Sequence, residues 1–231
     1  MGGQGNQEFS QSLVSVDVVP VWVKGGQVML GLGIRQLEPF KGVLALPGVL
    51  MGHERSLEAA LRALKSKVGI ERPRLLREAG VFDSPERDPR GPTLSLAKVA
   101  ILDPAEAETA RTAGNLSCVP LHEVASDPLE PREDALPFDH DRIVQHARKH
   151  LARELWVDEE ITRSLMGERF TTREAVAVHR DITGDVSLHP SNIRRRLIAL
   201  EGLEDSEEVV SEGQGRPSTA WQWQKPWGAP L

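Results

Sequence analysis

The sequence has a single cysteine, Cys118, and no apolar run close to the roughly 20 residues that a membrane-spanning helix needs. One cysteine cannot form an internal disulfide, and no companion cysteines complete a structural zinc site. The polar start MGGQGNQEFSQS lacks the basic and apolar regions of a signal peptide. These absences exclude disulfide-stapled and membrane classes, and we expect a cytoplasmic protein.

The remaining composition is that of an ordinary globular protein. Of the 231 residues, 39% are hydrophobic and 27% are charged, and a chain of this length usually forms one large or two modest domains. We predict two domains. The net charge of −6 means that any nucleic-acid surface must be a local basic patch rather than a field of the whole protein.

Three stretches of the first half predict regular elements. Partly alternating β-branched runs flank Gly25 and Gly26, which predicts two strands joined by a tight hairpin, and Pro20 places the first strand at an edge or a bulge. The stretch 93–102 alternates as a strand does. Between them, a helical stripe of apolar side chains is formed by Leu57, Leu61, Leu64 and Val68.

Residues 48–70, GVLMGHERSLEAALRALKSKVGI, have the frame of a Nudix box. Gly48 is followed by Glu54, Arg62, Gly69 and Ile70 at the spacing of that motif. In active members of the Nudix family, which this segment resembles, glutamates after the arginine bind Mg²⁺ and help to activate water. The corresponding positions here hold Ala63, Ser66 and Lys67.

These replacements remove the usual metal ligands. Mg²⁺ requires hard oxygen ligands, and a lysine ammonium repels it. Arg62 and Lys67 still suit a diphosphate. His146 and His150 share a helical face as metal ligands would, but no further partner completes a site, so we predict no metal site and no catalytic residues.

Two further stretches, GVFDSPERDPRG at 80–91 and LPFDHDRIVQHARKHL at 136–151, extend the likeness. With the box, they resemble the Nudix-related transcriptional regulators of NAD metabolism, the NrtR family, from about Val14 to Trp223. The resemblance implies an α+β chain: a Nudix fold, a mixed β-sheet in an α/β/α sandwich, followed by a winged helix-turn-helix domain. We place a tail at 1–13, the Nudix-like domain at 14–135, a connecting helix at 136–156 and the winged helix at 157–226.

The ligand site is predicted to centre on a diphosphate, because several cations converge near Gly48, where the missing side chain lets the backbone approach a ligand. The resemblance implies ADP-ribose or a related nucleotide as effector, with no cofactor. The predicted ligand-binding residues are Arg35, Phe40, Lys41, Gly48, Arg62, Lys67, Arg87 and Arg90.

The C-terminal part predicts a DNA-binding module. A capping box of Thr171 and Glu174 opens one helix, and Pro190 suits the first turn of the next. A buried stripe along this second helix turns Asn and Arg side chains outward, where Asn reads adenine, Arg reads guanine and flanking arginines bind phosphate. The predicted DNA-binding residues are Thr171, Thr172, Ser191, Asn192, Arg194, Arg195, Arg196 and Arg216, the last in a wing.

Two functions remain open from the sequence. The first is a regulator, expected to be a homodimeric repressor of NAD biosynthesis or salvage genes that binds palindromic double-stranded operator DNA and senses ADP-ribose. The alternative is a divergent Nudix hydrolase of ADP-ribose-like nucleoside diphosphates that uses Glu54, Glu58 or Glu86 in place of the missing carboxylates.

Overall fold

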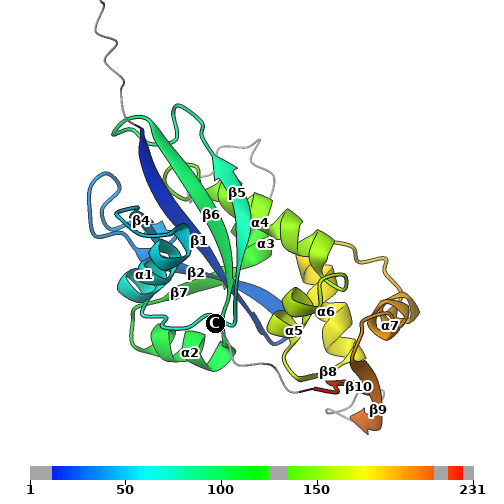
Figure 1. Ribbon diagram of the computed structural model, residues 1–231. Helices are drawn as coiled ribbons and strands as arrows, with labels where there is room; N and C mark the ends of the chain where they lie inside the picture. Colours follow the sequence, from blue (N-terminus) through cyan, green and yellow to red (C-terminus); the bar gives the residue numbers. More distant parts are fainter. Residues whose placement is uncertain (1–11, 125–134, 211–217, 226–231) are drawn as a thin grey trace, which may run out of the picture.

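The computed structural model describes residues 12–124, 135–210 and 218–225, and its largest element is a seven-stranded mixed sheet (Figure 1). The strand order is β3-β2-β1-β6-β5, with β4 also paired to β1 and β7 to β2. Among the pairings that the structure describes in this sheet, that of β1 with β6 is parallel and the others are antiparallel. The strands are β1 (Leu13–Lys24), β2 (Gln27–Ile34), β3 (Leu44–Ala45), β4 (Gly48–Leu50), β5 (Leu75–Phe82), β6 (Thr93–Ile101) and β7 (Ser117–Pro120).

The predicted hairpin of β1 and β2 is confirmed, with both turn glycines at positive φ, as a two-residue turn requires. The edge position predicted from Pro20 is wrong, because β1 lies inside the sheet. β4 pairs with Ser15–Asp17 and β2 with Val21–Lys24. Pro20 lies between these two partners, so its missing N–H leaves no gap in either ladder.

Helices cover both faces of the sheet, which confirms the predicted α/β/α sandwich. One face packs on α1 (Ser56–Val68) and α2 (Pro104–Thr112), the other on α3 (Leu121–Val124) and α4 (His140–Glu154) (Figure 1). Alternate valines of β1 reach opposite layers: Val16 and Val18 join the core under α1, and Val19 and Val21 join the core under α4.

The buried side of α1 differs from the predicted stripe. Leu64 and Val68 are buried, but Leu57 and Leu61 are exposed. The side facing the sheet is instead formed by Ala59, Ala60 and Ala63, all fully buried. Small side chains let the helix approach the sheet closely, and the larger leucines of the expected stripe then fall outside the contact.

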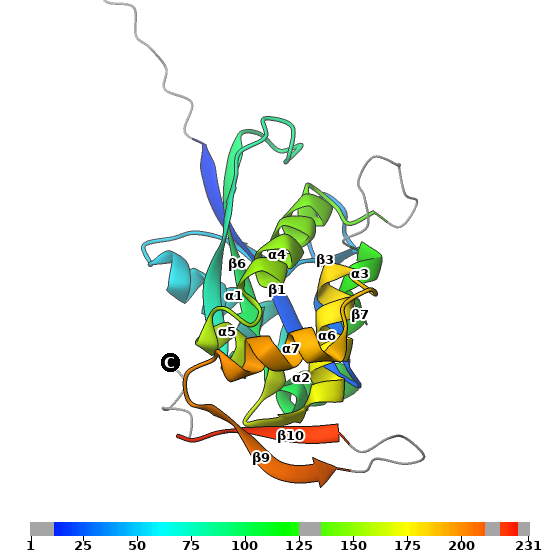
Figure 2. The ribbon, with the colours of Figure 1, turned by 90° about the vertical axis from the view of Figure 1, so that its right-hand side faces the viewer.

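The C-terminal domain has three helices and a small antiparallel sheet of order β8-β10-β9, the layout of a winged helix (Figure 2). The capping box of Thr171 and Glu174 and the buried side chains Ile193 and Leu197 lie as predicted. Its elements are α5 (Glu159–Met166), β8 (Arg169–Thr171), α6 (Thr172–Thr183), α7 (Pro190–Ile198), β9 (Leu203–Val210) and β10 (Ser218–Trp223).

The two domains share one continuous hydrophobic core, and α4 lies at its centre. Predicted as a connecting helix, α4 packs on both the sheet and α6. Arg148 donates from Nε to the carbonyl of Ile182 at 2.8 Å. Asp181 accepts from the backbone N–H of Val28 at 2.8 Å and lies 2.9 Å from Nδ1 of His122. The end of α6 is thus held by elements of the first domain.

Within the described ranges, no helix has the length and apolar character needed to cross a membrane. The predicted tail lies outside the described residues up to residue 11, and β1 begins at Leu13.

Candidate functional site

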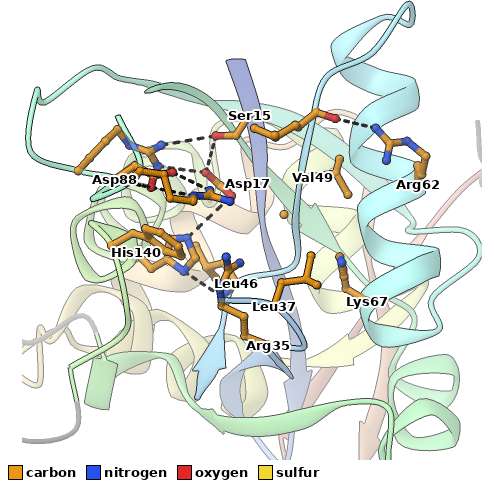
Figure 3. A pocket seen from close by; sticks show the side chains of 15 residues that line it. Ser15, Asp17, Arg35, Leu37, Leu46, Val49, Arg62, Lys67, Asp88 and His140 are labelled. Atoms are coloured by element: carbon orange, nitrogen blue, oxygen red, sulfur yellow. Dashed lines mark hydrogen bonds and ion pairs between the residues drawn. The ribbon is translucent and has the colours of Figure 1, made fainter. Parts of the chain in front are cut away.

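A cavity of about 330 Å³ opens between the sheet, α1 and the start of α4 (Figure 3). Its volume is in the range of small-molecule sites. Its lining contains more cations than acids, which suits an anionic ligand. The charged lining residues are Arg35, Arg62, Lys67, Arg87 and Arg90 on the positive side, with Asp17 and Asp88 on the negative side.

Arg35 and Arg90 gather around one aromatic ring in this cavity. The guanidinium carbon of Arg35 lies 4.8 Å from the ring centroid of Phe138, and that of Arg90 lies 5.8 Å away. Burial and the neighbouring charge of Arg90 lower the pKa of Arg35 below its ordinary value. Two like charges held this close would be stabilised by a bound anion.

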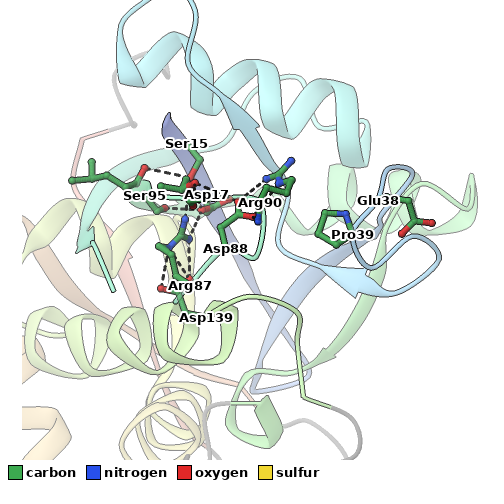
Figure 4. A network of polar contacts seen from close by, with 12 residues as sticks. Ser15, Asp17, Glu38, Pro39, Arg87, Asp88, Arg90, Ser95 and Asp139 are labelled. Atoms are coloured by element: carbon green, nitrogen blue, oxygen red, sulfur yellow. Dashed lines mark hydrogen bonds and ion pairs between the residues drawn. The ribbon is translucent and has the colours of Figure 1, made fainter. Parts of the chain in front are cut away.

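Arg87 lines the cavity but is engaged in a buried network (Figure 4). It donates from Nε to both carboxylate oxygens of Asp139 at 3.1 Å and from Nη2 to Asp139 Oδ1 at 2.8 Å, and Nη2 also reaches Asp17 Oδ2 at 3.1 Å. Burial lowers the pKa of Arg87, but the two carboxylates outweigh that effect and hold the pKa above its ordinary value. Arg87 therefore holds the carboxylates of Asp139 and Asp17 in place.

The α1 side of the cavity carries Lys67 and Arg62. Arg62 pairs with Glu54 and donates to the carbonyl of Leu50 at 2.9 Å. The pKa of Glu54 is lowered chiefly by this hydrogen bond from Arg62. Glu58 accepts from the N–H of Arg55 at 2.8 Å and caps the helix. Both carboxylates are thus already bound within the chain.

The three positions at which the resemblance led us to expect family glutamates have different surroundings. Ala63 is fully buried against the sheet, the hydroxyl of Ser66 donates to the carbonyl of Arg62 at 2.6 Å, and Lys67 lines the cavity. Within the described ranges, no group of three or more His, Cys, Asp or Glu side chains is placed to hold a metal ion.

Two predicted ligand residues lie away from the cavity lining. Lys41 is exposed and does not line this cavity, as far as the described residues define it. Phe40 does not line the cavity itself but packs edge-on against Phe138, which does, with ring centroids 5.1 Å apart. The rest of the predicted set, including Gly48, does line it.

Sequence reasoning missed five polar or aromatic lining residues. Asp17 offers the clearest signal in hindsight, because it is a lone charge within the apolar run VSVDVVPV. Asp88, Phe138 and His140 fall in stretches quoted only for their family likeness, and Ser15 has no distinguishing pattern. The missed lining residues are Ser15, Asp17, Asp88, Phe138 and His140.

A second candidate surface is α7, at the outer edge of the C-terminal domain (Figures 1 and 2). Ser191, Arg194, Arg195 and Arg196 are exposed along it, and Asn192 is half-buried beside them. Arg194 also pairs with Asp205 of β9 at 2.6 Å. The helix therefore presents a row of cations on a protein of net negative charge.

The threonines predicted to contact DNA have internal partners. The hydroxyl of Thr171 accepts from the N–H of Glu174 as the helix cap, and that of Thr172 accepts from the indole N–H of Trp221 at 2.8 Å. The predicted wing residue Arg216 lies outside the described residues.

Comparisons with known proteins agree with this architecture. No family model matches the chain. The chain is 30% identical over 112 residues to the ADP-ribose pyrophosphatase of Methanocaldococcus jannaschii. The aligned region covers 48% of this chain and 60% of that relative's length. A MutT/nudix family protein from Enterococcus faecalis superimposes with a TM-score of 0.66 at 21% identity, covering 95% of this chain and 90% of the other.

The structure of Shewanella oneidensis NrtR in complex with a 27mer DNA superimposes with a TM-score of 0.72 at 24% identity. The match covers 91% of this chain and 93% of that one, so it includes both domains. The chain therefore has the fold of the Nudix-related regulator NrtR, a Nudix domain followed by a winged helix domain.

Proposed function

We propose that this chain is a DNA-binding transcription regulator, acting as a repressor of NAD biosynthesis or salvage genes, whose Nudix domain binds ADP-ribose or a related nucleotide without hydrolysing it. The observation that carries the proposal is Lys67, one of the two α1 side chains that line the cavity. Lys67 lines the cavity where a metal-binding glutamate would serve catalysis. An ammonium group there favours a bound phosphate and disfavours Mg²⁺.

The ligand is proposed from the cavity's chemistry. Arg35, Lys67 and Arg90 supply cationic donors for a diphosphate, and Phe138 supplies an aromatic face. The relative from Methanocaldococcus jannaschii is named an ADP-ribose pyrophosphatase, which supports the same ligand class here. The lysine on the α1 side of the lining supports binding over turnover, because its ammonium group repels Mg²⁺.

The DNA partner is proposed from α7. Its exposed arginines and Asn192 form the kind of surface that enters a major groove. Arg195 and Asn192 would contact bases, and the flanking arginines would contact phosphates. Two such helices in a symmetric homodimer would read the two halves of a palindromic operator.

The link between the two sites runs through α4. Phe138 and His140, at its start, line the cavity, and Arg148 on the same helix binds a carbonyl at the end of α6. A ligand that shifts the start of α4 therefore biases the position of the winged helix. We expect ADP-ribose to weaken operator binding by about 1–3 kcal/mol of coupling free energy, and DNA to weaken ADP-ribose binding equally.

The named activity of the Methanocaldococcus relative supports a second candidate, a divergent hydrolase of ADP-ribose-like compounds. Two of the carboxylates it would use, Glu54 and Glu58, are bound to Arg62 and to the backbone of Arg55. Recruiting them for metal binding would break these contacts, so we rank this function second.

One experiment separates the two functions. Purified protein is incubated with ADP-ribose and Mg²⁺ while AMP is measured, and a gel shift is run with the DNA upstream of its own gene. The regulator predicts a DNA shift and no AMP. AMP release in proportion to enzyme concentration, with no DNA shift, would identify the hydrolase.

A further inference from the structure

Asp17 is a buried carboxylate in the cavity whose two oxygens have unequal surroundings. Oδ2 accepts three hydrogen bonds, from Ser15 Oγ at 3.1 Å, Ser95 Oγ at 2.6 Å and Arg87 Nη2 at 3.1 Å. Oδ1 accepts none from the residues that the structure describes. Asp17 lines the cavity and its side chain is only 9% exposed, so Oδ1 is a nearly buried carboxylate oxygen without a donor among these residues.

His140 lies beside this oxygen. Its Nδ1 accepts from the backbone N–H of Leu46 at 3.1 Å, which places the proton of the neutral ring on Nε2. Burial lowers the pKa of His140, so the ring is neutral at pH 7. Nε2 lies 3.8 Å from Asp17 Oδ1, too far for a hydrogen bond between the two (Figure 3).

The backbone of Gly48 lies close against this carboxylate oxygen. A Cβ on Gly48 would lie 2.1 Å from Asp17 Oδ1, so any side chain at this position would displace the carboxylate. Because Oδ1 and Nε2 are 3.8 Å apart and both residues line the cavity, one ligand oxygen can lie at about 2.8 Å from each atom, which is hydrogen-bonding distance.

We propose that Asp17 Oδ1 and His140 Nε2 together bind one ribose hydroxyl of the ligand, an inference that rests on the proposed binding of a nucleotide in this cavity. A hydroxyl both donates and accepts, so it satisfies the carboxylate and the imidazole N–H at once. A phosphate or carbonyl oxygen would face a carboxylate it cannot bond, and an amine would leave the imidazole N–H unpaired. The pair therefore selects sugar-bearing nucleotides among the anions that the arginines attract.

A ligand series tests this with the wild-type protein alone. Calorimetry compares ADP-ribose with ADP, which lacks the second ribose, and with ADP-ribose analogues lacking the 2′- or 3′-hydroxyl of the adenosine. We expect at least one of these to bind about 10- to 100-fold more weakly, because the missing hydroxyl leaves Asp17 Oδ1, a buried carboxylate oxygen, without a hydrogen-bond donor. Equal affinities within twofold across the series would overturn the proposal. If ADP-ribose itself does not bind, the proposed ligand class fails instead, and this inference fails with it.

Substitutions locate the effect. Asp17→Asn keeps the shape of the side chain, and its carbonyl can still accept from the three donors on the Oδ2 side, so an NH₂ group replaces the acceptor facing His140. We expect this variant to lose the discrimination between ADP-ribose and the weak analogue. Asp88→Asn is the matched control, because it removes the same charge from the same cavity at a carboxylate whose two oxygens both bind Arg90. Discrimination retained by Asp17→Asn, or lost equally in Asp88→Asn, would contradict the assignment.

Discussion

Replacing Arg87 with alanine should destabilise the protein far more than it directly weakens ligand contacts. The side chain is 3% exposed and binds Asp139 and Asp17, whose side chains are 7% and 9% exposed. Its removal leaves two buried carboxylates without their cation, and breaking such a pair costs about 3–5 kcal/mol. For a protein of this size, each kcal/mol lowers the melting temperature by about 2–4 °C, so Arg87→Ala should melt roughly 6–20 °C lower.

The assay is thermal unfolding followed by circular dichroism, with calorimetric ADP-ribose titration well below the melting temperature. Arg35→Ala is the control, because Arg35 binds the carbonyls of Glu38 and Pro39 rather than a buried carboxylate. We expect Arg35→Ala to keep its melting temperature within about 3 °C and to lose about 10- to 100-fold in affinity. If Arg87→Ala melts as the wild type does but no longer binds ADP-ribose, then Arg87 contacts the ligand directly. Its assignment as the residue that holds Asp139 and Asp17 in place is then wrong.

Three further predictions follow from single residues. Gly48→Ala should weaken ADP-ribose binding at least about tenfold by displacing the carboxylate of Asp17, whereas Gly52→Ala, with no atom within 4 Å of its new Cβ, should bind normally in calorimetry. Burial lowers the pKa of His179, so its contribution to stability is complete above about pH 6.5 and is lost as the pH falls below that value. The free energy of unfolding, measured in urea, should therefore be lower at pH 5.5 than at pH 7.5, and His179→Phe should reduce this difference. A difference that the variant leaves unchanged would contradict the prediction. Arg195→Ala should abolish sequence-specific gel shifts but leave ADP-ribose affinity intact, and specific shifts that persist would remove Arg195 from the interface.

Much of the fold was predictable because local signals agreed with tertiary packing. Gly25 and Gly26 predict the hairpin from turn chemistry alone, and the cap at Thr171 marks the start of α6. The edge position predicted from Pro20 is wrong because β1 changes its neighbour on one side from β4 to β2 close to this residue. A proline can therefore lie inside the sheet between the two pairings. Such a change of partner depends on contacts distant in sequence.

The site was less predictable, because residue type does not reveal which contacts a side chain has already made. Arg87 and Arg90 stand three residues apart, yet Arg87 is bound to carboxylates of β1 and of the residue before α4, while Arg90 binds the neighbouring Asp88. His140 was not predicted as a site residue, and its hydrogen bond from the backbone of Leu46, 94 residues away, depends on the tertiary fold.

The most direct test measures operator affinity with and without the nucleotide. An operator is first selected from random DNA by the wild-type protein, and its dissociation constant is then measured by fluorescence anisotropy at fixed salt with Mg²⁺ present. We predict that saturating ADP-ribose raises the dissociation constant by about 5- to 150-fold and that the ADP-ribose is recovered intact. An unchanged dissociation constant, with AMP accumulating in the same tube, would contradict the proposal that this chain senses the nucleotide rather than cleaving it.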